Sequence, residues 1–87
     1  MSYTVHILPR AQRQLAKLPA EVYPRVREAL RALAEEPRPV GCRKLVGREG
    51  WRLRVGQYRV IYEIDDEQRL VTILDIGHRR EVYRNSL

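Results

Sequence analysis

This sequence has little of what many small proteins use to brace a fold or to hold a cofactor. Its single cysteine, Cys42, has no partner for an internal disulfide, so packing alone must stabilise the fold. One cysteine and two well-separated histidines give no spacing typical of a metal site, and no glycine-rich phosphate motif is present. We therefore expect neither a metal nor a nucleotide cofactor.

Long apolar runs are missing as well. No stretch approaches the length of a membrane span, and Met1 to His6 contain neither the basic nor the apolar part of an export signal. We therefore expect a cytoplasmic protein with no membrane association. With 87 residues the chain has room for one hydrophobic core, which predicts a single domain over residues 1–87.

Arginine is the residue that the sequence has in excess. All of its 17 basic residues except Lys17 and Lys44 are arginine, and against 11 acidic residues they give a formal net charge of +6. Seven basic residues share one window with a single acid, Glu49; they are Arg38, Arg43, Lys44, Arg48, Arg52, Arg54 and Arg59. Because a guanidinium matches phosphate in shape and charge, this concentration predicts a polyanionic partner. The alternative is a solvated charged surface with no ligand.

The first half of the chain predicts one strand and two helices. Residues 3–8 have the composition of a short strand, and residues 9–19 carry apolar side chains at helical spacing. A second helix is expected over residues 20–36, where Pro37 and Pro39 end it. Two helices joined by a short break predict a helical hairpin.

The second half of the chain alternates with the period of two that is typical of strands. The expected strands cover residues 43–46, 51–55, 58–64 and 70–76, followed by a polar tail or helical turn over residues 78–84. Gly56 and Gln57 form a two-residue loop with glycine first, which favours a type II′ hairpin turn. The pattern predicts an α+β fold: an N-terminal strand, a helical hairpin, and a three- to four-stranded antiparallel sheet.

The predicted hairpin separates its side chains onto two faces, because strand residues alternate in direction. One face is apolar and aromatic and is expected to face the helices; it carries Trp51, Leu53, Val55, Tyr58, Val60 and Tyr62. The other carries Arg52, Arg54, Arg59, Ile61 and Glu63. Arg54 and Arg59 are predicted to pair directly, although like charges so placed cost about 0.2–1 kcal/mol. We interpret this face as a phosphate cradle; the alternative is that Glu63 and the sheet edge absorb the charge.

The reaction that fits such a cradle is RNA cleavage, in which the 2′-hydroxyl of the substrate is the nucleophile. Arginines neutralise the charge that develops on the phosphate but cannot exchange protons at neutral pH. The predicted charge stabilisers are Arg52, Arg54, Arg59 and Arg79. His78 and Tyr83 are the predicted proton-transfer groups, with Glu63 and Glu81 as weaker candidates. Further contacts to RNA are expected from Arg43, Lys44, Arg48, Arg80 and Arg84.

Two motifs in the second half resemble those of a known family. Residues 56–62 read G-x-Y-R-V-I-Y, and residues 78–83 read H-R-x-x-x-Y. Together with the opening strand and helix, they make the sequence similar to the RelE/ParE toxin superfamily of type II toxin–antitoxin systems over essentially the whole chain. The resemblance implies a RelE-like, microbial-ribonuclease-like α+β fold.

A RelE-type activity is implied by the same resemblance. It predicts a metal-independent endoribonuclease that cleaves mRNA in the ribosomal A site and leaves a 2′,3′-cyclic phosphate. It also implies a neutralising antitoxin, RelB-like or of another type, and promoter DNA as a partner only through the antitoxin complex. In this family the active positions correspond here to Arg52, Arg54, Arg59, Arg79 (or Arg80) and Tyr83.

Two departures from the RelE pattern affect these assignments. Arg52 and Arg54 stand where the family pattern has lysines, which can in principle exchange a proton, so more of that role moves to His78 and Tyr83. The tail also looks about two residues shorter before the tyrosine. A ParE-like toxin that binds DNA gyrase is the main alternative function, and a non-catalytic nucleic-acid-binding module is a third.

Overall fold

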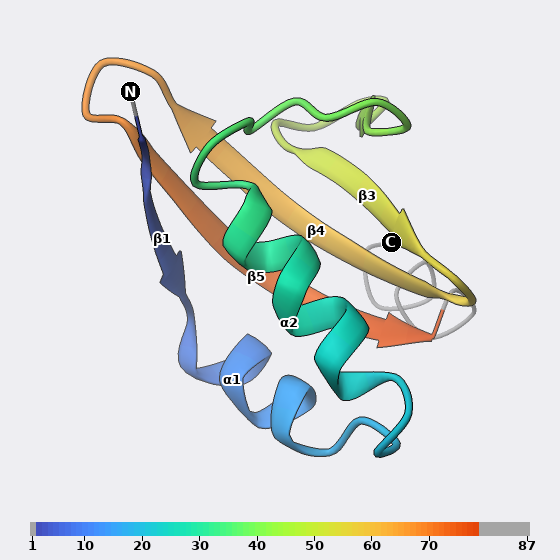
Figure 1. Cartoon of the computed structure of the whole chain (residues 1–87). Helices are drawn as coiled ribbons and strands as arrows, with labels where there is room; N and C mark the ends of the chain where they lie inside the picture. Colours follow the sequence, from blue (N-terminus) through green and yellow to red (C-terminus); the bar gives the residue numbers. More distant parts are fainter. Residues whose placement is uncertain (1, 79–87) are drawn as a thin grey trace.

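The computed structural model of the chain describes residues 2–78, in which two helices lie on one face of a five-stranded sheet (Figure 1). The helices are α1 (Pro9–Ala16) and α2 (Tyr23–Ala32). The strands are β1 (Thr4–Ile7), β2 (Arg43–Lys44), β3 (Trp51–Val55), β4 (Tyr58–Asp65) and β5 (Leu70–His78). The predicted α+β class is confirmed. No helix among residues 2–78 is long and apolar enough to cross a membrane.

The sheet has the order β1-β5-β4-β3-β2 and is mixed rather than purely antiparallel. Strands β2 to β5 pair antiparallel, whereas β1 pairs parallel with β5, with Val5 opposite Val71. The helical hairpin carries the chain away from β1 across one face of the sheet (Figure 1). The first and last described strands therefore become neighbours, which adds a fifth strand to the predicted sheet.

Both helices are shorter than expected. For α2, a proline in its first turn and a tighter helical turn at its end explain the difference. Pro24 occupies the first turn of α2, where its missing N–H leaves no helical hydrogen bond unmade, so the helix begins just before it. At the other end the backbone N–H groups of Ala34 and Glu35 donate to carbonyls three residues back. These bonds are those of a tighter helix, so α2 stops at Ala32.

The hairpin between β3 and β4 has the predicted register and turn. Arg54 lies opposite Arg59, and Val55 lies opposite Tyr58. Gly56 adopts a φ of 60° while Gln57 keeps a negative φ, as a type II′ turn requires. This turn geometry pins the register, and the register decides which face each side chain takes.

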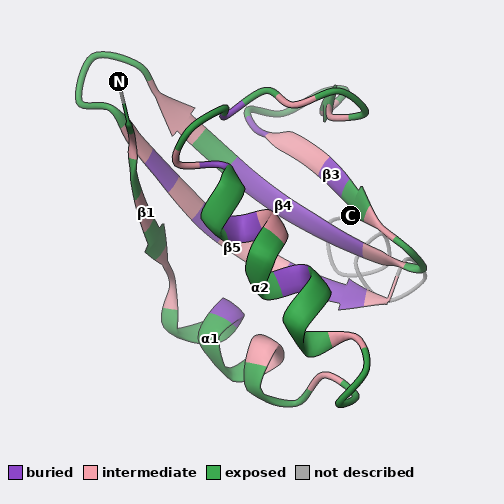
Figure 2. Ribbon diagram, in the orientation of Figure 1, coloured by how far each residue is buried: buried purple, intermediate pink, exposed green. Residues whose placement is uncertain are grey.

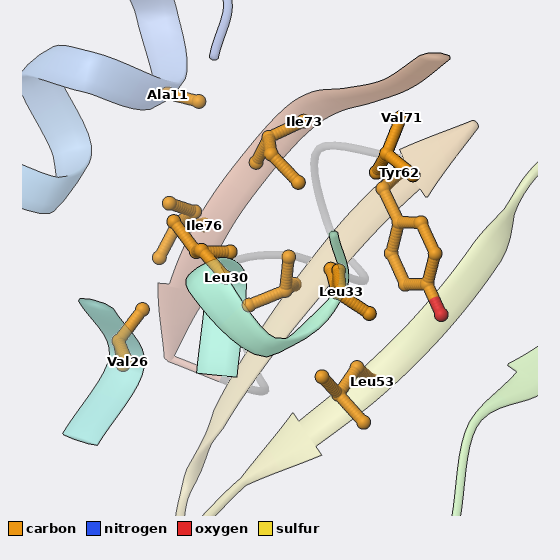
Figure 3. Packing of buried hydrophobic residues seen from close by; sticks show 10 residues of the cluster. Ala11, Val26, Leu30, Leu33, Leu53, Tyr62, Val71, Ile73 and Ile76 are labelled. Atoms are coloured by element: carbon orange, nitrogen blue, oxygen red, sulfur yellow. The ribbon is translucent and has the colours of Figure 1, made fainter. Parts of the chain in front are cut away.

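The core lies between the helices and the sheet (Figures 2 and 3). It consists of Ala11, Val26, Leu30, Leu33, Leu53, Val60, Tyr62, Val71, Ile73 and Ile76. A register shift puts Tyr62 opposite Ile73 and the preceding Ile61 opposite Asp75, leaving one extra residue on β5. This bulge allows both Ile73 and Ile76 to face the core despite their odd spacing.

Strand β5 is longer than predicted. Gly77 was expected to end it, but the strand continues to His78, because β4 offers Arg59 and Tyr58 as partners for Gly77 and His78. Non-local pairing therefore overrides the local tendency of glycine to end a strand. The extension also decides where the His78 side chain lies.

Candidate functional site

Strands β2, β3 and β4 bring four arginines around one hollow of about 480 Å³. Its lining consists of Gly41, Arg43, Arg52, Arg54, Gly56 and Arg59. We call it the arginine hollow. Among the described residues that line it, none is acidic. Four guanidinium groups therefore raise the local potential in a concave place, where the field of fixed charges is focused.

Strand pairing explains why these side chains converge. Arg54 lies opposite Arg59 across the β3–β4 ladder, and Arg52 lies opposite Arg43 across the β2–β3 ladder. Side chains at opposed positions point to the same face. The predicted opposition of Arg54 and Arg59 is confirmed, and the β2 pairing adds Arg43, which sequence reasoning had assigned only to general RNA contact.

Arg59 is the innermost of the four. It lies on the central strand β4 with only 7% of its surface exposed, and its Nη1 donates to the backbone carbonyl of Tyr58 at 3.4 Å. Arg54 is exposed and reaches the Gly56 carbonyl with its Nε at 3.5 Å. The hollow thus has one held guanidinium at its base and exposed guanidinium groups at its rim, a design that limits reorganisation when an anion enters.

Arg38 belongs to the basic window but not to the arginine hollow. Its guanidinium pairs with the Asp66 carboxylate, with Nη2 to Oδ2 at 2.9 Å, and lies 5.1 Å from the centre of the Trp51 ring. Asp66 also accepts the Tyr3 hydroxyl at 2.6 Å. These partners lower the pKa of Asp66, first through Arg38 and then through Tyr3. Asp66 in the β4–β5 turn therefore holds both the start of the chain, through Tyr3, and the segment after α2, through Arg38.

The remaining predicted contacts of the basic window lie apart from the hollow. Lys44 is exposed on β2 opposite Trp51, and Arg48 is exposed in the following loop. Neither lines the arginine hollow. Glu63 lines a different hollow at the other end of β4, with Glu49, Asp65, Asp66 and Glu67. This placement contradicts the idea that Glu63 absorbs the charge of the arginines or acts beside them.

His78 also lies elsewhere. As the last residue of β5 it stands opposite Tyr58, and the two rings meet edge to face with centroids 5.6 Å apart. Gln14 of α1 and the segment after that helix line the hollow that contains His78, so His78 lies on the helix-facing side of the sheet. The expectation that His78 belongs to a tail beside the arginines is therefore wrong in its placement, because β5 continues through it. Its role in the reaction stays a prediction.

Five further predicted site residues lie outside the described residues: Arg79, Arg80, Glu81, Tyr83 and Arg84. Their roles stay predictions. Sequence reasoning also overlooked Gly41, which has a φ of 96° and lines the arginine hollow beside Arg43. A glycine shortly after Pro39 was the local signal for it. The strand predicted over residues 43–46 is present but shorter, as β2 (Arg43–Lys44).

Comparisons with known proteins find relatives that match nearly the whole chain. A family model described as the ParE toxin of the type II toxin–antitoxin system, parDE, matches residues 5–83. Toxin RelG of Mycobacterium tuberculosis is 42% identical, over 97% of this chain and 99% of its own length.

Solved structures of the same kind share the fold. The toxin–antitoxin complex RelBE2 of Mycobacterium tuberculosis contains a chain with a TM-score of 0.80 and 35% identity, covering 91% of this chain and 100% of its own. The archaeal RelE–RelB complex of Pyrococcus horikoshii has a TM-score of 0.80 and 33% identity, covering 91% and 97% respectively.

Proposed function

This chain belongs to the RelE/ParE superfamily of toxins of type II toxin–antitoxin systems, and we propose that it is a ribosome-dependent mRNA endoribonuclease of the RelE type. Its role as the toxin of such a system follows from that membership. The nuclease activity rests on one observation: four arginines from three adjacent strands surround a hollow whose described lining holds no acidic residue. Such a site suits a phosphodiester.

RNA supplies its own nucleophile, so the protein needs to position and stabilise rather than to attack. The 2′-oxygen bonds to the adjacent phosphorus while the bond to the 5′-oxygen breaks, which yields a 2′,3′-cyclic phosphate and a 5′-hydroxyl. Negative charge grows on the non-bridging oxygens during this step. Arg59 stabilises that charge from a held position at the base of the hollow, Arg52 and Arg54 stabilise it from the sides, and Arg43 extends the contact along the backbone.

Proton transfer belongs to other groups, since a guanidinium stays protonated at any working pH. The 2′-hydroxyl must lose a proton and the leaving 5′-oxygen must gain one. Tyr83 is the proposed proton-transfer residue, and Arg79 or Arg80 adds a further cation. The position of His78 on the other side of the sheet shifts the weight of this assignment toward Tyr83.

The proposed partner is a cognate antitoxin, RelB-like or of another type II class. The solved relatives from Mycobacterium tuberculosis and Pyrococcus horikoshii are toxin–antitoxin complexes, RelBE2 and RelE–RelB respectively. We infer that the antitoxin covers the arginine hollow or distorts it, and that promoter DNA is bound only through the complex. The toxin then acts on ribosomes in the cytoplasm without a metal ion or other cofactor.

The gyrase-binding alternative is less well supported. One relative over nearly the whole chain is a RelG toxin, and the two solved relatives are toxins of RelBE-type complexes. A non-catalytic nucleic-acid-binding module would still present four arginines, so cutting has to be tested directly.

The test is in vitro translation with the purified full chain, with mRNA ends mapped by primer extension. We expect cuts only in ribosome-bound message, and none when the antitoxin is added first. A single 2′-deoxy nucleotide at a mapped cut site should prevent cutting there. The new 3′ ends should resist poly(A) tailing until a phosphatase that opens cyclic phosphates has acted.

Two variants sharpen this experiment. Arg59→Ala and Tyr83→Phe should each abolish growth arrest on induction, whereas Arg13→Ala, which removes an exposed charge from α1, should not. Full toxicity of both site variants would overturn the site assignment. Growth arrest without any mRNA cutting would overturn the nuclease proposal and favour a binding toxin.

A further inference from the structure

The tip of the β3–β4 hairpin has a cation beside it that belongs to the helix layer. Helix α2 lies alongside the hairpin, with its N-terminal end toward the tip (Figure 1). Arg25 is in the first turn of this helix, and its side chain is exposed. A β-carbon placed on Gly56 would lie 3.5 Å from Nη2 and 3.6 Å from Nη1 of Arg25. The forked end of this guanidinium therefore lies against the turn of the hairpin.

The same turn is a wall of the arginine hollow, because Gly56 lines that hollow. Gly56 has no side chain to fill the space between the turn and Arg25, and its φ of 60° is one that residues with a side chain rarely adopt. The loop has only two residues, so the two faces of the sheet meet at the tip. A cation there can act on an anion bound on the arginine side, the face away from the helices, without any part of that anion crossing the sheet.

The charge of Arg25 is available to a ligand. Elsewhere on α2, Arg31 pairs with Glu28, but none of the ion pairs between residues 2–78 includes Arg25. Its guanidinium stays protonated at any working pH and can donate two parallel hydrogen bonds to one phosphate. An exposed arginine that has no carboxylate partner in the described chain and lies against a wall of the arginine hollow is suited to a second phosphate.

Another arginine approaches the same glycine from the strand side. Nε of Arg54 is 3.5 Å from the carbonyl oxygen of Gly56. Arg25 and Arg54 thus bring like charges to one turn, and Arg59 lies opposite Arg54 across the ladder. Cations gathered in this way raise the local potential, and their repulsion is relieved when an anion binds among them.

We propose that Arg25 is a fifth arginine of the RNA-binding site and contacts a phosphate at the hairpin tip, next to the phosphate held in the arginine hollow. Arg25 reaches the RNA from the tip, and the RNA stays on the arginine side of the sheet. This inference rests on the proposed nuclease function. Because the contacted phosphate is not the one that reacts, the contact is equally strong in the bound substrate and in the transition state. Arg25 should therefore affect the concentration of toxin needed for cutting and not the maximal rate.

The first test compares an oligonucleotide that has one phosphate with an oligonucleotide that has two. The full chain is titrated by NMR with a dinucleotide and with a trinucleotide, both without terminal phosphates and made uncleavable by 2′-deoxy substitution. Arg25→Ala should leave the affinity for the dinucleotide unchanged and weaken binding of the trinucleotide several-fold. The salt dependence of log affinity for the trinucleotide should fall by about 0.7, as expected for one lost phosphate contact on a single strand.

Three further variants separate the charge of Arg25 from its shape. Arg25→Lys keeps the charge and should recover most of the lost affinity, whereas Arg25→Gln keeps a polar side chain without the charge and should resemble Arg25→Ala. Arg27→Ala is the matched control, because Arg27 is an exposed arginine of the same helix that lines a hollow beside β1, with Val5 and Ile7. It should bind both oligonucleotides like the parent. Thermal melts check that every variant is folded at the temperature of the titration.

The second test uses ribosome-bound message. Arg25→Ala should raise the toxin concentration for half-maximal cutting several-fold and leave the maximal single-turnover rate within twofold of the parent. A lower maximal rate at an unchanged half-maximal concentration would mean that Arg25 positions the hairpin and does not contact RNA. That result would overturn the proposal.

Three binding results would overturn it as well. Equal weakening of dinucleotide and trinucleotide binding would place the effect of Arg25 in the arginine hollow itself. Unchanged binding of both would identify Arg25 as a solvated arginine without a ligand. If Arg25→Ala weakens antitoxin binding alone, the hairpin tip belongs to the antitoxin. A parent protein that cuts no message refutes the proposed function, while the two titrations still decide whether Arg25 contacts a second phosphate.

Discussion

The two faces of the β3–β4 hairpin are built from alternate residues of the same strands, yet one is apolar and the other is mostly cationic. On the helix-facing side Leu53, Val60 and Tyr62 are buried, with 8%, 0% and 0% of their surface exposed. On the other side Arg52, Arg54 and Arg59 line a hollow with a third strand's Arg43. The comparison shows how a small protein can hold repelling charges in a fixed geometry: the packing on one face anchors the backbone that carries the charges on the other.

This comparison predicts a division between the two faces. Substitutions on the helix-facing side should mainly lower the free energy of unfolding, and substitutions on the arginine side should mainly lower the rate of RNA cutting. The largest effect is expected from Leu33→Ala. Leu33 is fully buried in the core, so its truncation should lower the free energy of unfolding by about 2–5 kcal/mol, measured by urea denaturation. Val46→Ala is the matched control, because Val46 is 98% exposed, and it should change stability by less than about 0.5 kcal/mol.

The next effect is on the arginine side. Arg59→Ala should reduce cutting of ribosome-bound message by about 10²- to 10³-fold, the loss typical of one fixed group that stabilises a developing oxyanion. The melting temperature should fall far less than the cutting rate, because the substitution also removes the like charge that lies opposite Arg54. Single-turnover cutting and a thermal melt on the same preparation check both points. A variant that cuts at the parent rate would break the division between the faces.

A smaller effect is expected from the one buried hydroxyl of the described core cluster. Tyr62 donates to the Pro37 carbonyl at 2.8 Å, so Tyr62→Phe should lower stability by about 1 kcal/mol. Burial raises the pKa of Tyr62, so its favourable contribution is complete below the unfolded pKa of about 10 and declines as pH rises above it. Denaturation of both proteins between neutral and alkaline pH should show the difference between them shrinking at high pH.

The smallest effect should have the opposite sign. Arg54→Gln removes one of two opposed cations and should raise stability by about 0.2–1 kcal/mol while it slows cutting. Arg54→Lys keeps the repulsion and should leave stability close to that of the parent. Chemical denaturation, averaged over several repeats, can measure these differences in the free energy of unfolding. A loss of stability in Arg54→Gln would mean that Arg54 contributes packing, and the two faces would then be less distinct than proposed.

Much of the hairpin could be read from the residues alone. The glycine at the first position of a two-residue loop selects the turn, the turn selects the register, and the register selects the face of each side chain. That chain of inference is local, and its product, Arg54 opposite Arg59, is confirmed. The helices and the α+β class follow from periodicity in the same way.

The placement of three residues could not be read locally. Arg43 reaches the hollow because β2 pairs with β3, Arg38 of the basic window pairs with Asp66 instead of lining the hollow, and His78 changes sides because β5 continues along β4. Each outcome depends on a partner that is distant in the chain. Spacing along the sequence carries no information about such partners.

By itself, the sequence determined the family, the two-helix and hairpin pattern, and the convergence of Arg54 with Arg59, because turn chemistry and side-chain alternation act over a few neighbouring residues. Only the tertiary structure decided that β1 joins β5 in parallel, that Arg43 completes the arginine hollow, and that His78 lies with Tyr58 on the opposite side. The physical reason is that sheet order and strand length depend on backbone hydrogen bonds between segments that are distant in the chain. Each strand can pair with several others, so the outcome depends on the whole fold.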